Sequence, residues 1–334
     1  MKKRRLKILI LLTLFTGVLI GLNGFDQQVE ITQIQNSSNT LGMRSDSPIN
    51  ITKNDDFEIY KSQGNGSLGN PYIIEDYMIG WVGSPGISIS NTTAYFILRK
   101  CTVRETRCDG IRLYHVGNGT LEYNFLEANR HNGIHLCSSD YNTLMNNTCN
   151  GNYYRGIEIY QSDFNNIINN TLIDNSLVGF DIADSMNNNI SHNIMNGIEM
   201  IDSENNIIDN NKIKNSSYGI YARGTSTNNQ IINNLITNNV ICGILLLSGS
   251  NYNVSGNTIN NNGYYGIYIN ANYSWITWNI IHGNQECIGE YEENIGNVIE
   301  NNDCGTVPGF EWIFALFGLI GILFYLAKRR QIVI

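Results

Sequence analysis

One short unit recurs along the middle of the chain, and it limits the possible folds more than any other feature. A glycine followed by an apolar residue, any residue and a second apolar residue occurs nine times from Gly86 to Gly266, at intervals of 24, 23, 23, 23, 18, 22, 24 and 23 residues. Between these units apolar and polar residues alternate, and no stretch shows the period of a helix. The repeat predicts a solenoid of short strands, in which one repeat forms one coil and the core forms only between neighbouring coils.

Two columns of asparagine support this stacking. About nine residues before the repeat glycines stand Asn124, Asn147, Asn170, Asn193, Asn211, Asn234 and Asn257. About four residues before them stand Asn129, Asn152, Asn175, Asn215, Asn239 and Asn262. Asparagine tolerates the left-handed backbone of a tight turn, and its amide can bond to the same amide one coil away, at about 4.8 Å. We therefore expect amide ladders at the bends. A leucine-rich repeat has a similar period, but its Leu-x-x-Leu-x-Leu pattern is absent from the sequence.

Both ends of the chain differ from the repeats. Basic residues from Lys2 to Lys7 precede an apolar stretch, 8–22, which is the layout of a secretory signal, either cleaved or kept as a signal anchor. The apolar segment 312–327 is followed by three basic residues, 328–330, which predicts a membrane-spanning helix with its basic tail inside and the repeats outside. We expect a signal at 1–25, a polar linker at 26–47, the coils at 48–306, a transmembrane anchor or sorting signal at 307–327 and a cytoplasmic tail at 328–334.

The repeats and the segment 64–74, Gly-Asn-Gly-Ser-Leu-Gly-Asn-Pro-Tyr-Ile-Ile, resemble the pectin-lyase-like superfamily of right-handed β-helix proteins. Within it they resemble the NosD-type repeat proteins often labelled periplasmic copper-binding. This resemblance implies an all-β, single-stranded right-handed parallel β-helix of about nine to eleven coils. From the two chain ends we expect, in addition, an N-terminal signal helix and a C-terminal transmembrane helix. Separately, Pro308-Gly309-Phe310 and the segment after it resemble the carboxy-terminal sorting signals of archaeal surface proteins, although the charged Glu311 departs from that pattern.

Charge excludes one class of partner. Without the eight basic residues at the two ends, 13 Lys and Arg remain against 29 Asp and Glu, so residues 26–327 are strongly acidic and we expect no nucleic-acid partner. Seven of the remaining bases nevertheless fall between Arg99 and Arg155, so charge is segregated along the chain. The seven cysteines match no known framework; Cys287 and Cys304 either bridge near the last coil or remain free thiols.

The variable residue of each repeat unit points outward, so these residues form a row with about 4.8 Å between coils. The row reads Ser88, Arg112, His135, Glu158, Asp181, Glu199, Tyr221, Leu245 and Tyr268. In enzymes of the superfamily that the repeats resemble, the active groove lies over this strand, so the resemblance implies a site here. The expected ligand-binding residues are Arg112, His135, Arg155, Glu158, Asp181 and Glu199.

Three stacked carboxylates of this row, on Glu158, Asp181 and Glu199, are the catalytic candidates. Their mutual repulsion raises at least one pKa or attracts a divalent cation such as Ca²⁺, and neighbours about 5 Å apart suit a retaining glycosidase pair. A charged face that only keeps the protein soluble is the alternative. The metal candidates His131, His135 and Cys137 are residue types that suit copper, although on one strand they are equally typical of unconnected surface and core positions.

Motifs favour binding over catalysis. The Asn-Thr-Asp, paired-Asp, Gly-His-Gly and Arg-Ile-Lys motifs expected of a polygalacturonase-like relative are missing from the coils. We expect a cell-surface module, anchored to a membrane by its C-terminal helix, that binds extracellular polysaccharide or serves as an adhesive or structural surface protein. A polysaccharide lyase, glycoside hydrolase or epimerase is the alternative, and a NosD-like accessory to copper-site assembly is a second alternative. Sequons such as Asn91 and Asn118 permit glycosylation of an exported protein.

Overall fold

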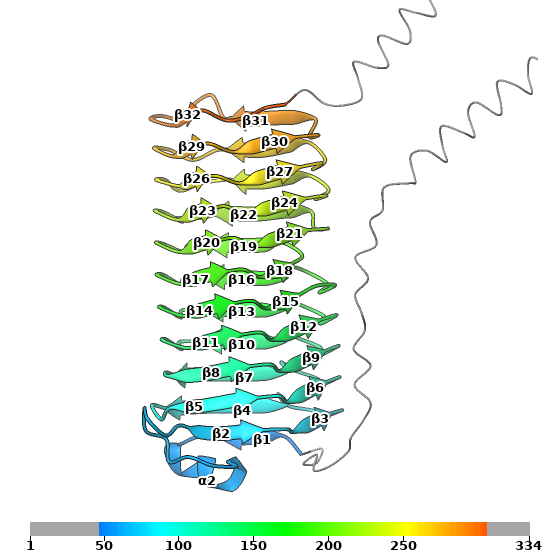
Figure 1. Ribbon diagram of the computed structural model, residues 1–334, viewed down its shortest axis with the longest axis vertical. Helices are drawn as coiled ribbons and strands as arrows, with labels where there is room; N and C mark the ends of the chain where they lie inside the picture. The colour runs from blue at the N-terminus through cyan, green and yellow to red at the C-terminus, as the bar shows by residue number, and fades with distance from the viewer. Residues whose placement is uncertain (1–46, 306–334) are drawn as a thin grey trace, which may run out of the picture. The chain divides into compact units, whose positions relative to one another are not determined.

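The computed structural model describes residues 47–305, which form one stack of coils built from three parallel sheets (Figure 1). The first sheet contains β1 (Ile49–Ile51), β4 (Ile87–Thr92), β7 (Ile111–Val116), β10 (Ile134–Cys137), β13 (Ile157–Tyr160), β16 (Phe180–Ala183), β19 (Ile198–Ile201), β22 (Tyr218–Arg223), β25 (Cys242–Leu246), β28 (Tyr265–Ile269) and β31 (Glu286–Glu290). The second contains β2 (Tyr72–Glu75), β5 (Phe96–Arg99), β8 (Gly119–Glu122), β11 (Thr143–Met145), β14 (Asn166–Ile168), β17 (Asn189–Ser191), β20 (Ile207–Asp209), β23 (Gln230–Ile232), β26 (Asn253–Ser255), β29 (Trp275–Thr277) and β32 (Val298–Glu300). The third contains β3 (Met78–Gly80), β6 (Thr102–Arg104), β9 (Phe125–Glu127), β12 (Thr148–Asn150), β15 (Thr171–Leu172), β18 (Ile194–Met195), β21 (Lys212–Lys214), β24 (Leu235–Thr237), β27 (Thr258–Asn260) and β30 (Ile280–His282).

The predicted all-β solenoid is confirmed, with 11 strands in each of the first two sheets and 10 in the third. The expected signal, most of the linker and the membrane segment lie outside the described residues. Within residues 47–305 no helix is long and apolar enough to cross a membrane.

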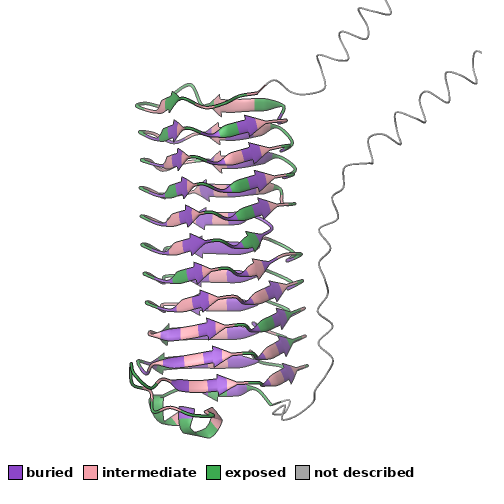
Figure 2. Ribbon diagram, in the orientation of Figure 1, coloured by how far each residue is buried: buried purple, intermediate pink, exposed green. Residues whose placement is uncertain are grey.

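The core forms because apolar and polar residues alternate along each strand, so that the apolar side chains point into the stack. Ile111 pairs in parallel register with Ile87 and Ile134, and all three side chains are fully buried. Figure 2 shows buried and partly buried residues alternating along the strands of the stack. The repeat glycine is required by crowding at the sheet corner: a Cβ on Gly133 would lie only 2.7 Å from the Cβ of Cys149 in the next coil. The repeat unit therefore encodes both an interior column and a close approach of the backbones.

Amide ladders run along the bends, as the asparagine columns predict. The Asn147 side chain donates to Asn170 Oδ1 at 3.0 Å and to the Leu121 carbonyl at 2.8 Å, and the Asn147 backbone N–H reaches the same Asn170 oxygen at 2.9 Å. Each ladder amide thus satisfies backbone groups of the preceding coil, as the Asn147 side chain does for the Leu121 carbonyl and the Asn124 N–H, and bonds to the amide of the next coil. A third ladder, which the sequence analysis missed, consists of Asn142, Asn165, Asn188, Asn206 and Asn229.

The expectation that Asn215 belongs to a ladder is wrong. Its side chain is exposed on a left-handed residue, and the backbone N–H of the next residue, Ser216, donates to Asn239 Oδ1 at 3.1 Å instead. The ladder position lies five residues after Asn211, as Asn175 lies five residues after Asn170, and it therefore falls on Ser216. One coil earlier, Asn196 and Gly197 follow β18 directly, whereas six residues separate β15 from Gly179, so the corner loop that carries the ladder residue is shorter there.

The two ends of the stack are closed differently. At the N-terminal end a short 3-10 turn, η1 (Asn54–Asp56), and one helical turn, α2 (Phe57–Tyr60), lie beneath the first coil (Figure 1). Phe57 is fully buried and stacks on Tyr72 with the ring centroids 4.8 Å apart. These helical turns lie outside the two segments in which helix was expected. At the other end Cys287 and Cys304 form a disulfide, so the bridged alternative of the sequence analysis holds.

Candidate functional site

The predicted surface row exists as a row of in-register neighbours on the first sheet. Parallel pairing joins Ser88 to Arg112, Arg112 to His135, His135 to Glu158, Glu158 to Asp181, Asp181 to Glu199 and Glu199 to Tyr221. The row continues through Leu245 to Tyr268. Strand pairing therefore brings the five ionisable side chains together on one outer face, as the repeat spacing predicts.

Asp109, which the sequence analysis did not single out, organises the first end of the row. Its buried carboxylate accepts from the Arg112 guanidinium at 2.7 Å and lies 3.5 Å from His135 Nδ1. The backbone and side-chain amides of Asn132 also donate to it, at 3.1 and 3.2 Å. Burial alone would raise the pKa of Asp109, but the hydrogen bond and charge of His135, together with Arg112, hold that pKa below its ordinary value.

Arg155 ties the middle of the row together. Its Nη1 lies 3.1 Å from Glu158 Oε1, and its Nε donates to Asp181 Oδ2 at 2.7 Å. Glu158 also accepts from the Asn132 amide at 2.7 Å and lies 3.6 Å from His135 Nε2. One guanidinium therefore links two carboxylates on adjacent coils and offsets their repulsion.

Asp181 departs from the expectation of an outward, solvent-facing row, because its side chain is only 1% exposed. Burial is the largest cause that raises the pKa of Asp181 to about 6, while Arg155 acts against it and the carboxylates of Glu199 and Glu158 add to it. Repulsion between the stacked carboxylates, the predicted cause of a raised pKa in this row, contributes to the shift of Asp181, but burial contributes more. Glu199 has its own partner, since Arg223 Nε lies 3.0 Å from its Oε1.

These contacts weaken the catalytic interpretation of Glu158, Asp181 and Glu199. Each carboxylate is paired with an arginine, and Asp181 is almost fully covered. A glycosidase acid must reach the glycosidic oxygen, and a nucleophile must reach the sugar carbon. What the geometry offers a ligand is a partly exposed set of planar polar groups, on Arg112, His135 and Glu158.

Tyrosines share this outer face. Tyr114 and Tyr160 are exposed, and both pair in register with Cys137, so they lie two coils apart beside the charged row. Further along the same sheet Tyr218 packs against Tyr221, and Tyr265 packs against Tyr268, at 5.2 and 4.9 Å between ring centroids. The outer face of the first sheet therefore runs from a charged network into a tyrosine-rich region.

The proposed copper ligands do not form one set. Both ring nitrogens of His135 face carboxylates, the His131 ring lies 5.2 Å from the Tyr154 ring, and Cys137 is flanked by Tyr114 and Tyr160. Among residues 47–305 no group of three His, Cys, Asp or Glu side chains is arranged to hold a metal ion.

One sequence signal could have found the missed residues. Asp109, Asn132 and Arg155 each stand immediately before a repeat glycine, three residues ahead of a row residue. This second column supplies the partners of the first. Arg223, by contrast, follows its row residue by two positions, and only the register between β19 and β22 brings it to Glu199.

Comparisons with known proteins agree with this architecture. The model of the family described as periplasmic copper-binding protein (NosD) matches residues 20–196, and that of the right handed beta helix region matches residues 185–304. The PGF-CTERM motif matches residues 307–330 and indicates a membrane-anchored protein of the cell surface. No curated protein matches the chain significantly. The right-handed β-helix and the NosD-type resemblance are thus confirmed.

Solved structures show the same fold. The periplasmic alginate epimerase AlgG aligns with a TM-score of 0.51 and 12% identity, over 71% of this chain and 77% of that chain. A mutant of AlgG with a single substitution aligns with a TM-score of 0.54 and 13% identity, over 71% of this chain and 75% of that chain. At such identities the likeness concerns the fold alone.

Proposed function

This chain belongs to the NosD family of right-handed parallel β-helix proteins, and we propose that it is a cell-surface module that binds extracellular carbohydrate on the outer face of its first sheet. The PGF-CTERM motif makes it a membrane-anchored surface protein. In the proposed orientation the coils lie outside the cell and the basic tail, 328–334, lies inside. Such a module holds its binding face on a rigid stack, because parallel pairing in three sheets fixes every coil except the last, which pairs in two.

The observation that carries the proposal is the combination of exposed tyrosines with planar polar groups on one face. Tyr114 is 44% exposed and Tyr160 is 38% exposed, and two coil spacings, about 10 Å, separate their strands. Aromatic rings offer flat apolar surface to the C–H faces of sugars, while arginine, histidine and carboxylate groups bond to hydroxyls. The arginines and carboxylates beside these tyrosines are paired, so their charges largely cancel. Their remaining N–H groups and oxygens can still form hydrogen bonds with an uncharged sugar.

Binding of the full-length protein to a glycan array tests the proposal. We expect the parent to bind at least one glycan class, and the double variant Tyr114→Ala/Tyr160→Ala to bind it about tenfold more weakly, because the stacking surface is lost. The matched control is Phe125→Ala/Trp275→Ala, which removes two exposed aromatic rings from the third and second sheets. Absence of binding to every glycan, or equal loss in the control, contradicts the proposal.

A further inference from the structure

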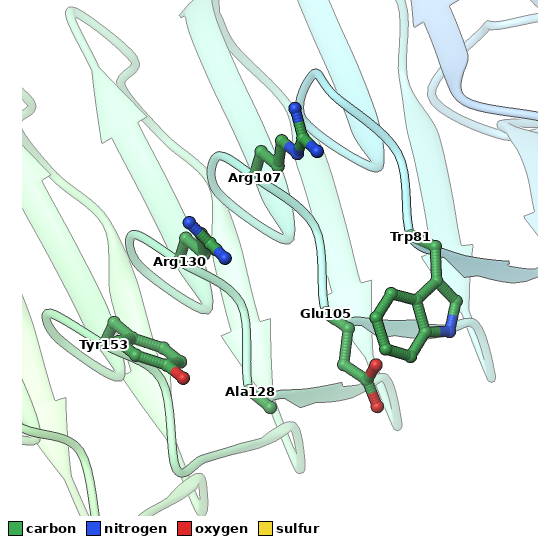
Figure 3. A pocket seen from close by; sticks show the side chains of 6 residues that line it. All are labelled: Trp81, Glu105, Arg107, Ala128, Arg130 and Tyr153. Atoms are coloured by element: carbon green, nitrogen blue, oxygen red, sulfur yellow. The ribbon is translucent and has the colours of Figure 1, made fainter.

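A second polar hollow lies away from the row, at the corner between the third and first sheets. It has a volume of about 360 Å³ and is lined by Trp81, Glu105, Arg107, Ala128, Arg130 and Tyr153 (Figure 3). We call it the corner hollow. Its residues come from the loops that follow β3, β6, β9 and β12, so it spans four successive coils. Its volume falls at the lower end of the range of small-ligand sites.

Two arginines without an acidic partner stand side by side in the corner hollow. The Arg107 backbone N–H donates to the Val82 carbonyl at 2.9 Å, and the Arg130 backbone N–H donates to the Thr106 carbonyl at 3.0 Å. Each arginine loop is therefore hydrogen-bonded to the loop of the preceding coil. Both side chains are exposed, and neither forms an ion pair with any residue of the described coils. By contrast, Arg112 of the row and the arginines beside the row, Arg155 and Arg223, all have carboxylate partners.

This arrangement favours an anion. Arg107 and Arg130 stand at equivalent positions of adjacent coils, whose backbones lie about 4.8 Å apart, so their positive charges repel each other. A negative group between them relieves this repulsion, and the planar fork of arginine matches the oxygens of a carboxylate or sulfate. The remaining acidic group of the hollow, Glu105, lies beside the Trp81 indole rather than between the arginines (Figure 3). It is therefore placed to accept from a hydroxyl of the ligand, and leaves the arginines with a net positive charge.

Two exposed aromatic rings also line the corner hollow: Tyr153 follows Arg130 on the arginine side, and Trp81 lies beside Glu105 (Figure 3). Trp81 is 81% exposed and Tyr153 is 61% exposed. Aromatic faces beside charged forks suit a ligand that combines a flat C–H surface with anionic groups, which describes an acidic sugar better than an acidic peptide. The region outside the two chain ends is acidic, yet seven basic residues lie between Arg99 and Arg155. An anion site in the corner hollow gives two of them, Arg107 and Arg130, a role.

We propose that the corner hollow binds an acidic sugar unit of an extracellular polysaccharide, with its carboxylate or sulfate between Arg107 and Arg130 and its ring against Trp81 or Tyr153. The inference rests on the proposed function in taking carbohydrate as the ligand, but it depends on a different set of side chains. Carboxylate and sulfate share the chemistry that the arginines recognise, and separate probes distinguish them.

The test compares four probes on the full-length protein in detergent micelles: an oligogalacturonate, a sulfated chondroitin oligosaccharide, a neutral oligosaccharide and poly-glutamate. We expect at least one acidic oligosaccharide to bind, and Arg107→Gln/Arg130→Gln to weaken its binding at least tenfold and flatten its salt dependence. Trp81→Ala should weaken it severalfold. The control Lys53→Gln/Lys212→Gln removes two equal charges from exposed positions elsewhere and should change affinity less than twofold. Unchanged thermal unfolding shows that the variants are folded.

The possible failures are distinguishable. If the arginine variant binds the acidic oligosaccharides as the parent does, or if the parent binds none of them, the corner hollow is not an acidic-sugar site, whatever the neutral probe does. Equal affinity for poly-glutamate contradicts a carbohydrate ligand and indicates a site for acidic peptides.

The two double variants separate this inference from the proposed function. If Tyr114→Ala/Tyr160→Ala loses glycan binding and Arg107→Gln/Arg130→Gln does not, the proposed function is supported and this inference is overturned. If only the arginine variant loses binding, the corner hollow is supported and the placement of the ligand on the first sheet is overturned.

Discussion

Asp109 and Asp181 are both buried in the network on the first sheet, yet their pKa values are shifted in opposite directions. Asp109 lies beside the Arg112 guanidinium and the His135 imidazole, and accepts from two amide donors of Asn132. Asp181 has one cationic partner, Arg155, which it shares with Glu158. The number of partners for each buried carboxylate thus decides whether burial or pairing prevails.

Asp181→Asn should gain stability relative to the parent as pH rises. The folded-state pKa, about 6, lies above that of an unfolded aspartate, so the native parent binds more protons between about pH 4 and 6 and loses stability across that window. The variant has no ionisable side chain at position 181, so it does not lose this stability as pH rises. We expect its free energy of unfolding, relative to the parent, to increase by about 1–3 kcal/mol between pH 4 and pH 7. Thermal unfolding of both proteins across this range measures the difference, and a constant difference would contradict the account.

Asp109→Asn should show the opposite pH dependence. Its folded-state pKa lies below the unfolded value, so its contribution is present above about pH 4 and is lost as pH falls through the folded pKa. We expect the variant to be less stable by about 1–3 kcal/mol at pH 7, and the difference from the parent to narrow progressively as pH falls below about 4, as judged by chemical denaturation. The exposed Asp184→Asn serves as control and should change stability little at either pH.

At the scale of single elements, the asparagine ladders tie one coil to the next. Asn170 accepts two bonds from Asn147 and donates to the Leu144 carbonyl and to Asn193. Neighbouring strands of three residues offer few backbone bonds of their own, so the bends need these side chains to satisfy buried backbone groups. Each ladder residue therefore supports two coil interfaces.

Asn170→Asp tests the ladder with an isosteric change. The carboxylate keeps the acceptor oxygens but cannot donate to the Leu144 carbonyl, and it places a charge at a site that is 1% exposed. We expect a loss of at least about 2 kcal/mol at pH 7 in the free energy of unfolding, measured by chemical denaturation. Asn215→Asp is the matched control, because Asn215 is exposed and Asp tolerates its left-handed backbone. Equal effects of the two substitutions would show that the ladder adds nothing.

The repeat predicted the coils, their interior isoleucines and the order of the row, because all three depend only on the glycine spacing and on the alternation of apolar and polar residues along a strand. It did not predict contacts between side chains of different coils. Arg155 covers Asp181 through a contact 26 positions apart in the sequence, and Ser216 rather than Asn215 occupies the ladder position beside Asn239. The corner hollow was likewise missed, although Arg107, Arg130 and Tyr153 each stand three residues before a repeat glycine and the other three lining residues each stand five residues before one.

At the scale of the whole molecule, a solenoid couples each coil only to its neighbours, so substitutions in the row and in the corner hollow should leave distant coils unchanged. The membrane anchor then sets the orientation of the stack. Protease added outside intact cells should remove the coils and leave a protected fragment that contains Lys328–Ile334. An antibody against the C-terminal tail detects that fragment, and protection of the entire chain would reverse the proposed orientation.

The central claim, that carbohydrate binds to the outer face of the first sheet, is tested most directly by mapping the bound ligand. Hydroxyl-radical footprinting of the full-length protein, with and without a saturating glycan that it binds, reports the exposure of individual side chains. The account predicts protection of Tyr114, His135 and Tyr160, and no change at Trp275 on the second sheet. Protection at Trp275 with the three first-sheet residues unchanged, under conditions where binding is saturated, would contradict it.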